Sequence, residues 1–203
     1  MRKTFLIVSA LVFLHLGLHA QETGCPRFTY GAEWSYAAFF YYGYHYNFYA
    51  PEGYRVDPRG HSATYESNGE AYLHAGCNFN HKYNLSLYAG LSAVMEYHHT
   101  VPVSLRLTRY YGDSHMKDRW LSFIDLGSGI ILKEHTQELY TGKIGGGYRL
   151  SLSRDTKLDF IVTIRTILTH PDIEYDGVEI VPERINRNNL YCSGASIGMA
   201  LTF

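Results

Sequence analysis

The feature that most constrains the fold of this chain is a two-residue alternation of apolar and polar side chains over unusually long segments. In residues 28–38, large apolar or alanine side chains occupy every second position, with mostly small or polar ones between them. Successive side chains of a β-strand point to opposite faces, so the pattern predicts a strand with one apolar face. It recurs and predicts about eight strands, at residues 28–38, 70–79, 84–96, 101–111, 120–132, 137–151, 156–169 and 189–203.

The length of these segments separates two β architectures. The predicted strands have about 11 to 15 residues, whereas a tilted membrane strand needs about 9 to 11 and a soluble strand has about 5 or 6. The composition of 19 Tyr and 19 Gly with six Pro also favours strands over helices. We therefore expect an all-β fold, a closed antiparallel up-and-down transmembrane β-barrel of about eight strands. A soluble secreted β-sandwich is the alternative.

The connections between the predicted strands alternate in length. Short turns at 80–82, 112–118 and 152–155 alternate with connections at 41–68, 97–99, 133–136 and 170–188, of which the first and last are long. Transmembrane barrels have this layout, with short periplasmic turns and longer extracellular loops. We therefore expect residues 41–68 and 170–188 to be loops exposed to the medium.

The N-terminus has the pattern of a secretory signal peptide. Arg2 and Lys3 precede an apolar run that ends at Leu18. This run is too short and too interrupted for a transmembrane helix, which needs about 20 apolar residues. We expect residues 1–20 to be a cleaved signal peptide and residues 21–203 to form one barrel domain outside the cytoplasm.

Charge and cysteine content bound the classes of function. The formal net charge of −1 gives no indication of a nucleic-acid partner. Cys25, Cys77 and Cys192 cannot all pair within the chain, and they lack a metal-binding spacing such as C-x-x-C. We expect no disulfide framework, no metal site and no cofactor.

The chain ends in SGASIGMALTF, with large apolar residues at alternate positions up to the last one. This ending resembles the C-terminal signal that the assembly machinery of bacterial outer-membrane barrels recognises. The resemblance assigns that role to Gly198, Leu201 and Phe203. It also makes outer-membrane lipid and the assembly machinery the implied partners.

The match extends over the whole mature chain, to small eight-stranded outer-membrane barrels of Gram-negative bacteria. The stretches FTYGAEW, NLSLYAG and KIGGGYRLSLSRDTKLDF resemble an uncharacterised barrel family of Bacteroides-type bacteria. The resemblance implies a Gram-negative outer-membrane location. It carries no catalytic motif, because barrels of this size serve as adhesins, anchors and enzymes, and fold alone does not determine function.

The polar faces of the predicted strands carry charges of both signs. The interior of an eight-stranded barrel is just wide enough for side chains, and an unpaired buried charge is costly. We therefore expect direct Arg–carboxylate pairs in a plugged lumen, with a narrow pathway for protons or small solutes as the alternative. The predicted inward set is Glu33, Glu70, His74, Arg106, Asp125, Lys143, Arg149, Asp159 and Arg165.

The densest aromatic run, FFYYGYHYNFY at residues 39–49, follows the first predicted strand. Its first part is typical of the aromatic girdle at a membrane interface. Its second part, with Tyr44, His45, Tyr46 and Tyr49, is a candidate binding surface for an unidentified extracellular partner, because tyrosine offers a large contact area at low conformational cost. An ordinary loop, or haem ligation by Tyr and His, are the alternatives.

A catalytic hypothesis rests on Ser92, Glu96, His98 and His99, near one end of a predicted strand. A Ser/His/Glu set supports nucleophilic acyl hydrolysis, here of membrane lipid. Adjacent histidines in a strand point to opposite faces, so at most one could serve Ser92. The spacing is not diagnostic, and we expect a non-catalytic outer-membrane anchor that presents its first and fourth loops to a partner.

Overall fold

The computed structural model describes residues 26–94, 98–132 and 137–203, without the side chains of Val94 and His98. The predicted signal peptide and Glu96 lie outside the described residues. Within the described ranges, no helix is long and apolar enough to cross a membrane.

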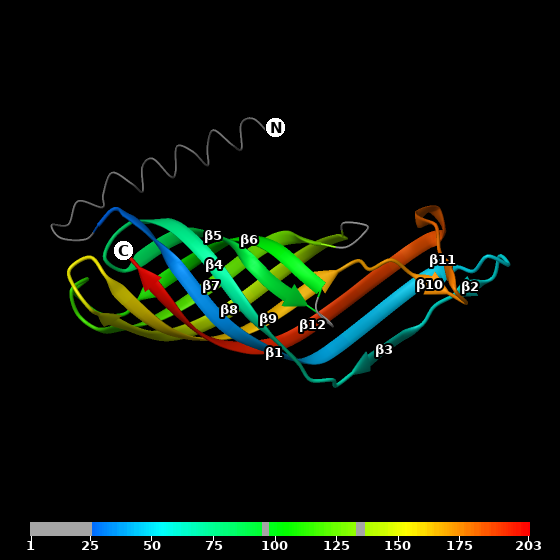
Figure 1. The fold of residues 1–203 in the computed structure, drawn as a ribbon, viewed down its shortest axis with the longest axis horizontal. Coiled ribbons are helices and arrows are strands. Elements are labelled where there is room, and N and C mark those ends of the chain that lie inside the picture. The colour runs from blue at the N-terminus through cyan, green and yellow to red at the C-terminus, as the bar shows by residue number, and fades with distance from the viewer. Residues whose placement is uncertain (1–25, 95–97, 133–136) are drawn as a thin grey trace, which may run out of the picture.

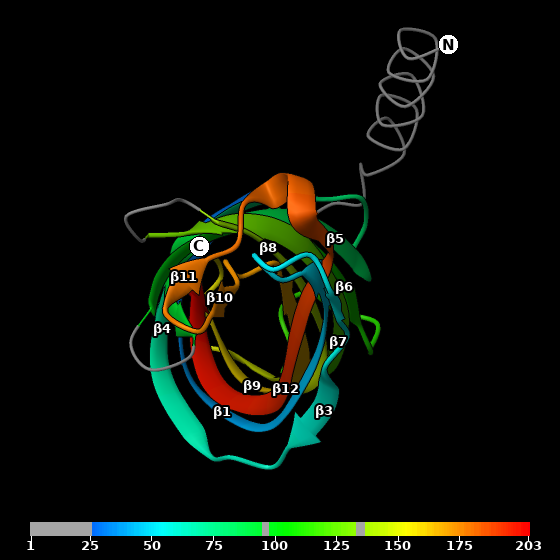
Figure 2. The same ribbon diagram turned by 90° about the vertical axis from the view of Figure 1, so that its right-hand side faces the viewer.

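A ring of eight long antiparallel strands forms the body of the molecule (Figures 1 and 2). Each strand of the ring pairs with its neighbour along the chain, and the last closes the ring on the first. The predicted fold class, a closed up-and-down barrel, is therefore confirmed. The strands are β1 (Phe28–Tyr49), β4 (Glu66–Asn78), β5 (Tyr83–Val94), β6 (His98–Tyr110), β7 (Arg119–Ile131), β8 (Gln137–Ser151), β9 (Lys157–Thr169) and β12 (Ile185–Thr202).

The two faces of the barrel wall differ as the alternation predicts. Outward side chains such as Trp34, Leu105 and Ile164 are more than half exposed, while the charged inward ones are buried. Among the described strand residues, no Asp, Glu, Lys or Arg occupies an outward position between Arg109 at one edge of the wall and Glu138 at the other. An uncharged outer belt of this kind suits contact with hydrocarbon.

The two ends of the barrel are built differently. At one end, here named the turn end, the connections 79–82, 111–118 and 152–156 join neighbouring strands. At the other end, β1 and β12 continue past their neighbours, since β4 begins opposite Phe39 and β9 ends opposite Leu190.

The extension forms an arm, defined here as residues 41–62 and 170–189, which projects from the barrel in Figure 1. Pairing between β1 and β12 continues to Phe48 and Ile185. Two further strands fold back onto β1, and a hairpin and a 3₁₀ helix lie between β9 and β12. These elements are β2 (Arg55–Val56), β3 (Arg59–Ser62), β10 (Glu174–Tyr175), β11 (Val178–Glu179) and η1 (Pro182–Arg184).

The predicted loops at 41–68 and 170–188 are thus wrong over much of their length. Residues 41–49 continue β1, and a register shift between Phe39 and Tyr41 interrupts the alternation there, leaving Phe40 and Tyr41 both exposed. A bulge redirects a strand without ending its pairing, and the aromatic residues that follow favour strand structure. The predicted connection at 97–99 is also too long, because β6 begins at His98.

A small core of its own stabilises the distal part of the arm. Phe48, Ile173 and Ile180 are buried against one another, and Tyr175 packs beside them. The Tyr175 hydroxyl lies 2.9 Å from that of Tyr54, and this hydrogen bond raises the pKa of Tyr54 to about 12. The distal part of the arm is therefore packed around a core that is separate from the barrel interior.

Candidate functional site: the barrel interior and the arm

Three charged clusters follow one another along the barrel interior, named here lower, middle and upper in order of distance from the turn end. The lower cluster lies nearest the turn end. Arg149 on β8 and Asp159 on β9 are cross-strand partners joined by two hydrogen bonds, Nε to Oδ1 at 2.6 Å and Nη2 to Oδ2 at 2.7 Å. The guanidinium carbon of Arg149 lies 4.3 Å from the centre of the Tyr110 ring, and that of Arg119 lies 4.1 Å from it. A bidentate pair held against an aromatic ring has a fixed geometry.

The middle cluster centres on Arg106 of β6. Its Nε donates to Asp125 Oδ2 at 3.0 Å on the neighbouring strand. Its other nitrogens reach Glu33 on β1, Nη1 to Oε2 at 2.5 Å and Nη2 to Oε1 at 3.2 Å. The guanidinium carbon lies 3.9 Å from the ring centre of Tyr88 and 4.2 Å from that of Phe123. This cation therefore bridges two carboxylates between two aromatic rings.

The upper cluster centres on Glu70 of β4. Its carboxylate pairs with Arg165 of β9 and accepts hydrogen bonds from Ser35 Oγ at 3.1 Å and Ser92 Oγ at 2.5 Å. Lys143 lies nearby, with Nζ 3.0 Å from the hydroxyl of Tyr72. Because β4 and β9 are not neighbours in the ring, the Arg165–Glu70 pair spans the interior, as Arg106–Glu33 does between β6 and β1.

An apolar layer lies above the upper cluster, at the arm end of the interior. Phe39 and Cys192 are fully buried in it, and Tyr42 packs against it. The Phe39 ring centre is 5.0 Å from the Arg165 guanidinium carbon, so the layer rests directly on the charged residues. Its members are Ala37, Phe39, Ile131, Leu139, Ile167, Leu190 and Cys192.

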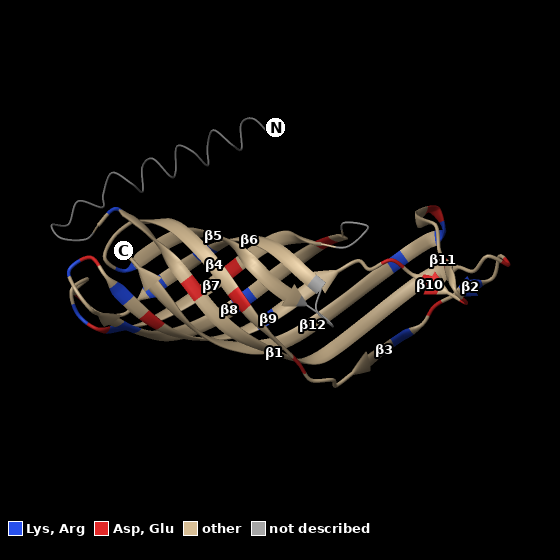
Figure 3. Cartoon of the chain, viewed as in Figure 1, with Lys and Arg blue, Asp and Glu red and all other residues tan. Residues whose placement is uncertain are grey.

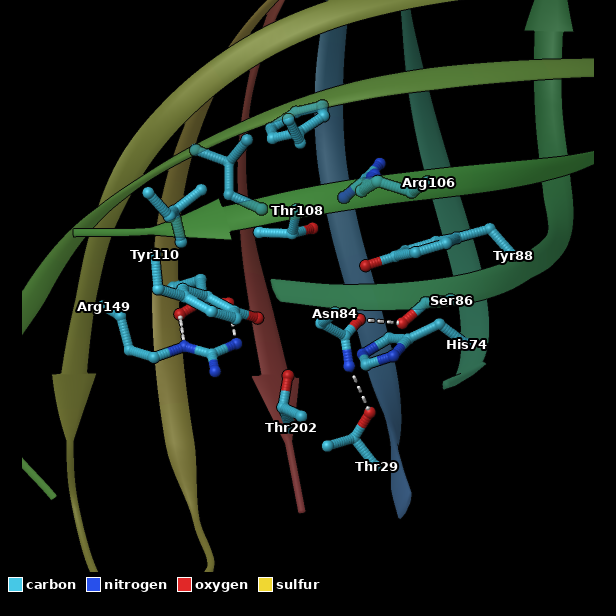
Figure 4. Close-up of a pocket in the computed structure, with 14 residues that line it drawn as sticks. Thr29, His74, Asn84, Ser86, Tyr88, Arg106, Thr108, Tyr110, Arg149 and Thr202 are labelled. Atoms are coloured by element: carbon cyan, nitrogen blue, oxygen red, sulfur yellow. Dashed lines mark hydrogen bonds and ion pairs between the residues drawn. The ribbon is translucent and has the colours of Figure 1, made fainter. Parts of the chain in front are cut away.

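A cavity of about 20 Å³ lies between the lower and middle clusters (Figure 4). His74, Tyr88 and Arg106 line one side of it, and Arg149 lines the other. His74 stacks on Tyr88 with ring centres 4.9 Å apart, and within the described chain neither of its buried ring nitrogens has a hydrogen-bond partner. A space of this size holds about one water molecule, which could form hydrogen bonds with those nitrogens.

A buried histidine lies in the turn that joins β6 to β7, at the turn end. Burial, together with the positive charges of Lys157, Arg119 and Arg149, lowers the pKa of His115 to about 4. The side chain is therefore neutral at pH 7, which relieves repulsion in a basic environment.

The four predicted binding residues of the arm do not share one face. Tyr44 and Tyr46 stack with ring centres 5.4 Å apart, whereas His45 points to the other face of the strand. Tyr49 lies further out, opposite Arg55 of β2, and is exposed. These residues therefore form two separate surfaces.

His45 is held between a carboxylate and a guanidinium group. Its Nε2 lies 3.0 Å from Asp57 Oδ1, and its Nδ1 lies 3.1 Å from a guanidinium nitrogen of Arg187. The hydrogen bond from His45 lowers the pKa of the exposed Asp57. Since both ring nitrogens are engaged, His45 has no nitrogen left for haem iron in this arrangement.

The proposed hydrolytic residues are not brought together where the structure describes them. Ser92 is buried, donates to Glu70 and lies opposite Thr100, whereas His99 is exposed and lies opposite Ala93. Ser92 and His99 therefore face opposite sides of the barrel wall. Glu96 and the side chain of His98 lie outside the described residues.

Sequence reasoning missed the aromatic partners of the buried cations and the apolar layer. The signal for both was the alternation itself. Phe123 has the same parity as Asp125, and Phe39 has the same parity as Glu33, so both were predictable as inward residues. Their inward position conflicts only with the expectation that an eight-stranded interior is polar.

A closed ring of eight antiparallel strands, with an uncharged outer belt and a polar interior, defines the class of small outer-membrane-type β-barrels. No family model and no curated protein matches this chain. Several solved structures resemble it, among them the three that follow. The outer membrane protein OprG from Pseudomonas aeruginosa is 13% identical with a TM-score of 0.48, covering 91% of this chain and 99% of that one.

The N-terminal β-barrel domain of Pseudomonas aeruginosa OprF is 13% identical, with a TM-score of 0.42 over 85% of this chain and 99% of that one. Neisserial surface protein A is 11% identical, with a TM-score of 0.42 over 87% of this chain and 97% of that one. At such identities no residue role is transferred. The resemblance to a Bacteroides-type family stays a prediction.

Proposed function

We propose that this chain is a non-catalytic anchor in a Gram-negative outer membrane, with a plugged lumen and an arm that presents a binding surface to an extracellular partner. The filling of the interior carries the proposal. Three charged clusters and an apolar layer follow one another along the barrel axis. The cavity between the lower and middle clusters has a volume of about 20 Å³.

A permeating ion would have to disrupt several contacts at once. It would separate Arg106 from Glu33, whose side chains are 3% and 5% exposed, and it would displace the fully buried Phe39. Separating a buried ion pair leaves each charge without a partner in a low-dielectric interior, which is costly. The interior therefore supports an anchor better than a pore.

Planar-bilayer recordings of the purified protein test the plugged lumen. We expect no stable large conductance from the wild type, and none from Phe48→Ala, a control that alters only the arm core. Steady ion-selective channels from the wild-type protein would overturn the proposal and favour the narrow pore.

For the partner surface, we propose the face that carries Tyr44 and Tyr46; Tyr49 pairs with Arg55 and lies on the opposite face, with His45. Tyr44 is exposed, and its stacking on Tyr46 fixes the orientation of both rings before any partner binds. Such preordered aromatic surfaces bind at low entropic cost.

The orientation of the barrel in the membrane can be tested by labelling single cysteines on intact cells, in a background without Cys25, Cys77 and Cys192. We expect a membrane-impermeant thiol reagent to label Ser62→Cys in the arm and to leave Ser153→Cys at the turn end unlabelled. The reverse pattern would place the arm in the periplasm and remove the proposed surface.

We further propose that the assembly machinery recognises the last strand. Phe203 exchanges two backbone hydrogen bonds with Tyr30, at 2.8 and 3.1 Å, and their ring centres are 5.7 Å apart. Leu201 faces outward, and a Cβ at Gly198 would meet the Trp34 carbonyl oxygen at 2.6 Å. The C-terminal residues thus also close the seam between β12 and β1.

Replacing Phe203 with Asp tests the assembly role. We expect less folded, heat-modifiable protein in the outer membrane with export unchanged, and we expect Phe203→Tyr to assemble normally because it keeps the aromatic ring. Normal outer-membrane levels of the Asp variant would contradict the signal.

A further inference from the structure

The face of the arm that continues the outer belt of the barrel is basic. Cross-strand pairing places His61 and Tyr191 on either side of Gly43, and these three residues form a first row. Arg59 lies beside His45, two residues further along β1, in the next row. Arg187 follows opposite Asn47, and Figure 3 shows basic residues on β2, β3 and the arm part of β12. This basic face consists of His45, Arg55, Arg59, His61 and Arg187, with Asp57 as its acidic member among the described residues.

The side chains of the basic face are held in place across three strands. Arg187 contacts His45, which contacts Asp57, and Arg55 Nε donates to Asn47 Oδ1 at 3.2 Å. The guanidinium groups of Arg59 and Arg187 belong to exposed residues. The face is therefore prearranged and accessible to an anionic ligand.

Aromatic rings lie where the basic face meets the belt. The Tyr41 ring centre is 6.2 Å from that of His61 and 5.9 Å from that of Tyr191. A Cβ at Gly43 would meet the Tyr191 ring at 2.0 Å, so glycine allows this ring to lie flat on the sheet. Tyrosine concentrates at the boundary between hydrocarbon and headgroups.

We propose that the basic face docks on the phosphate-bearing headgroups of anionic lipid in the membrane that holds the barrel. Two observations identify the occupant: the face is charge-complementary to phosphate, and it is continuous with the lipid-facing belt. Arginine binds phosphate in bidentate geometry, and clustered basic residues near a membrane bind anionic lipid. The inference rests on the proposed membrane insertion of the barrel.

The heights of the rows agree with this occupant. We take Phe40, the last residue before the arm, as the edge of the hydrocarbon. With a rise of about 3.3 Å per residue and a tilt of about 45°, the row at Gly43 lies about 7 Å above this edge and the row at His45 about 12 Å above it. A headgroup layer is about 5 to 8 Å thick on each side of the hydrocarbon. The first row lies within this layer, and the flexible arginine side chains of the next can reach back to it.

Three acidic residues of the arm lie on a separate hairpin. Glu174, Asp176 and Glu179 are exposed on the β10–β11 hairpin, which packs against Phe48 on the face of β1 opposite to His45. Anionic headgroups would repel the hairpin and attract the basic face. This charge separation would orient the arm, with the opposite face, carrying Tyr44 and Tyr46, left free for an extracellular partner.

Native mass spectrometry in neutral detergent micelles tests the docking, with phosphatidylglycerol as the probe and phosphatidylcholine as the neutral reference. At about tenfold per 1.4 kcal/mol, and about 1 kcal/mol per basic residue, Arg59→Gln/Arg187→Gln should weaken phosphatidylglycerol binding about 30-fold. The control Lys117→Gln/Arg154→Gln removes two exposed charges from turn-end connections. It should change binding less than about threefold, because neither residue belongs to the basic face and an electrostatic contribution depends on distance from the bound headgroup.

Three outcomes would overturn the inference: equal phosphatidylglycerol binding by wild type and double variant, equal binding of both lipids by the wild type, or displacement of the lipid by millimolar inorganic phosphate, which would indicate a free-anion site. The lipid comparison needs no variant, so it decides even if the double variant misfolds. Arg59→Lys/Arg187→Lys should retain most of the binding. Failure of the wild type to insert into lipid vesicles, seen by heat-modifiable migration, would instead count against the membrane anchor itself.

Discussion

The barrel and the arm are built from the same two strands, yet they are stabilised in different ways. Within the barrel, β1 and β12 are paired on both sides, and their inward side chains meet others across an enclosed interior. In the arm, residues 185–189 of β12 pair with β1 alone among the described strands. Closure therefore buries the inward side chains of the barrel, whereas in the arm Phe48 is buried by the added residues Ile173 and Ile180.

The ion pairs show the same difference in energy. Arg106 and Asp125 are almost fully buried, whereas His45 and Asp57 are 29% and 44% exposed at the same contact distance of 3.0 Å. Solvent screening makes an exposed pair contribute about 0 to 1 kcal/mol, whereas breaking a buried one costs about 3 to 5 kcal/mol. Contact geometry alone therefore does not reveal which pair stabilises the fold.

The largest effect is expected from removing the central cation of the barrel. Arg106→Ala leaves Glu33 and Asp125 as unmatched buried carboxylates and should lower the free energy of unfolding by about 3 to 5 kcal/mol. Arg187→Ala in the arm should lower it by less than about 1 kcal/mol. Urea unfolding in detergent micelles measures both, and equal effects would remove the distinction between the two regions.

A second pair of variants separates the two cores. Phe39→Ala opens the apolar layer and should lower the global free energy of unfolding by about 3 kcal/mol or more. Phe48→Ala should instead unfold the arm locally, because the core of Phe48, Ile173 and Ile180 is separate from the barrel interior.

Amide hydrogen exchange distinguishes these outcomes. For Phe48→Ala we expect faster exchange at residues 46–56 and 173–185 and an unchanged urea midpoint for the barrel. If this variant shifted the global midpoint as much as Phe39→Ala does, the arm and the barrel would be one cooperative unit.

The smallest effect concerns pH at the turn end. The pKa of His115 is about 4 in the folded protein against an ordinary value of 6.5, so the unfolded chain takes up a proton first as the pH falls. Its contribution to stability is therefore present above pH 6.5 and is lost between about pH 6.5 and 4. His115→Gln should make the unfolding free energy less dependent on pH in this window, and an unchanged slope would show that His115 does not contribute.

The sequence alone was sufficient for the wall of the barrel. Alternation requires only local backbone geometry, so it identified eight strands, their inner and outer faces, and the buried positions of residues such as Arg106, Asp125 and Arg165. Cross-strand neighbours such as Arg149 and Asp159 are also close to predictable, because a short turn fixes the register of their two strands.

Only the tertiary structure decided what lies opposite what. Arg106 meets Glu33 from 73 residues away, and Arg165 meets Glu70 across the ring, because the tilt and stagger of the closed barrel set these distances. The arm was likewise hidden, since a bulge after Phe39 breaks the alternation while pairing continues. Alternation assigns each side chain to the inner or the outer face, whereas closure of the sheet determines which residues it contacts. For this reason the sequence determined the barrel wall, and the tertiary structure determined how the interior is filled.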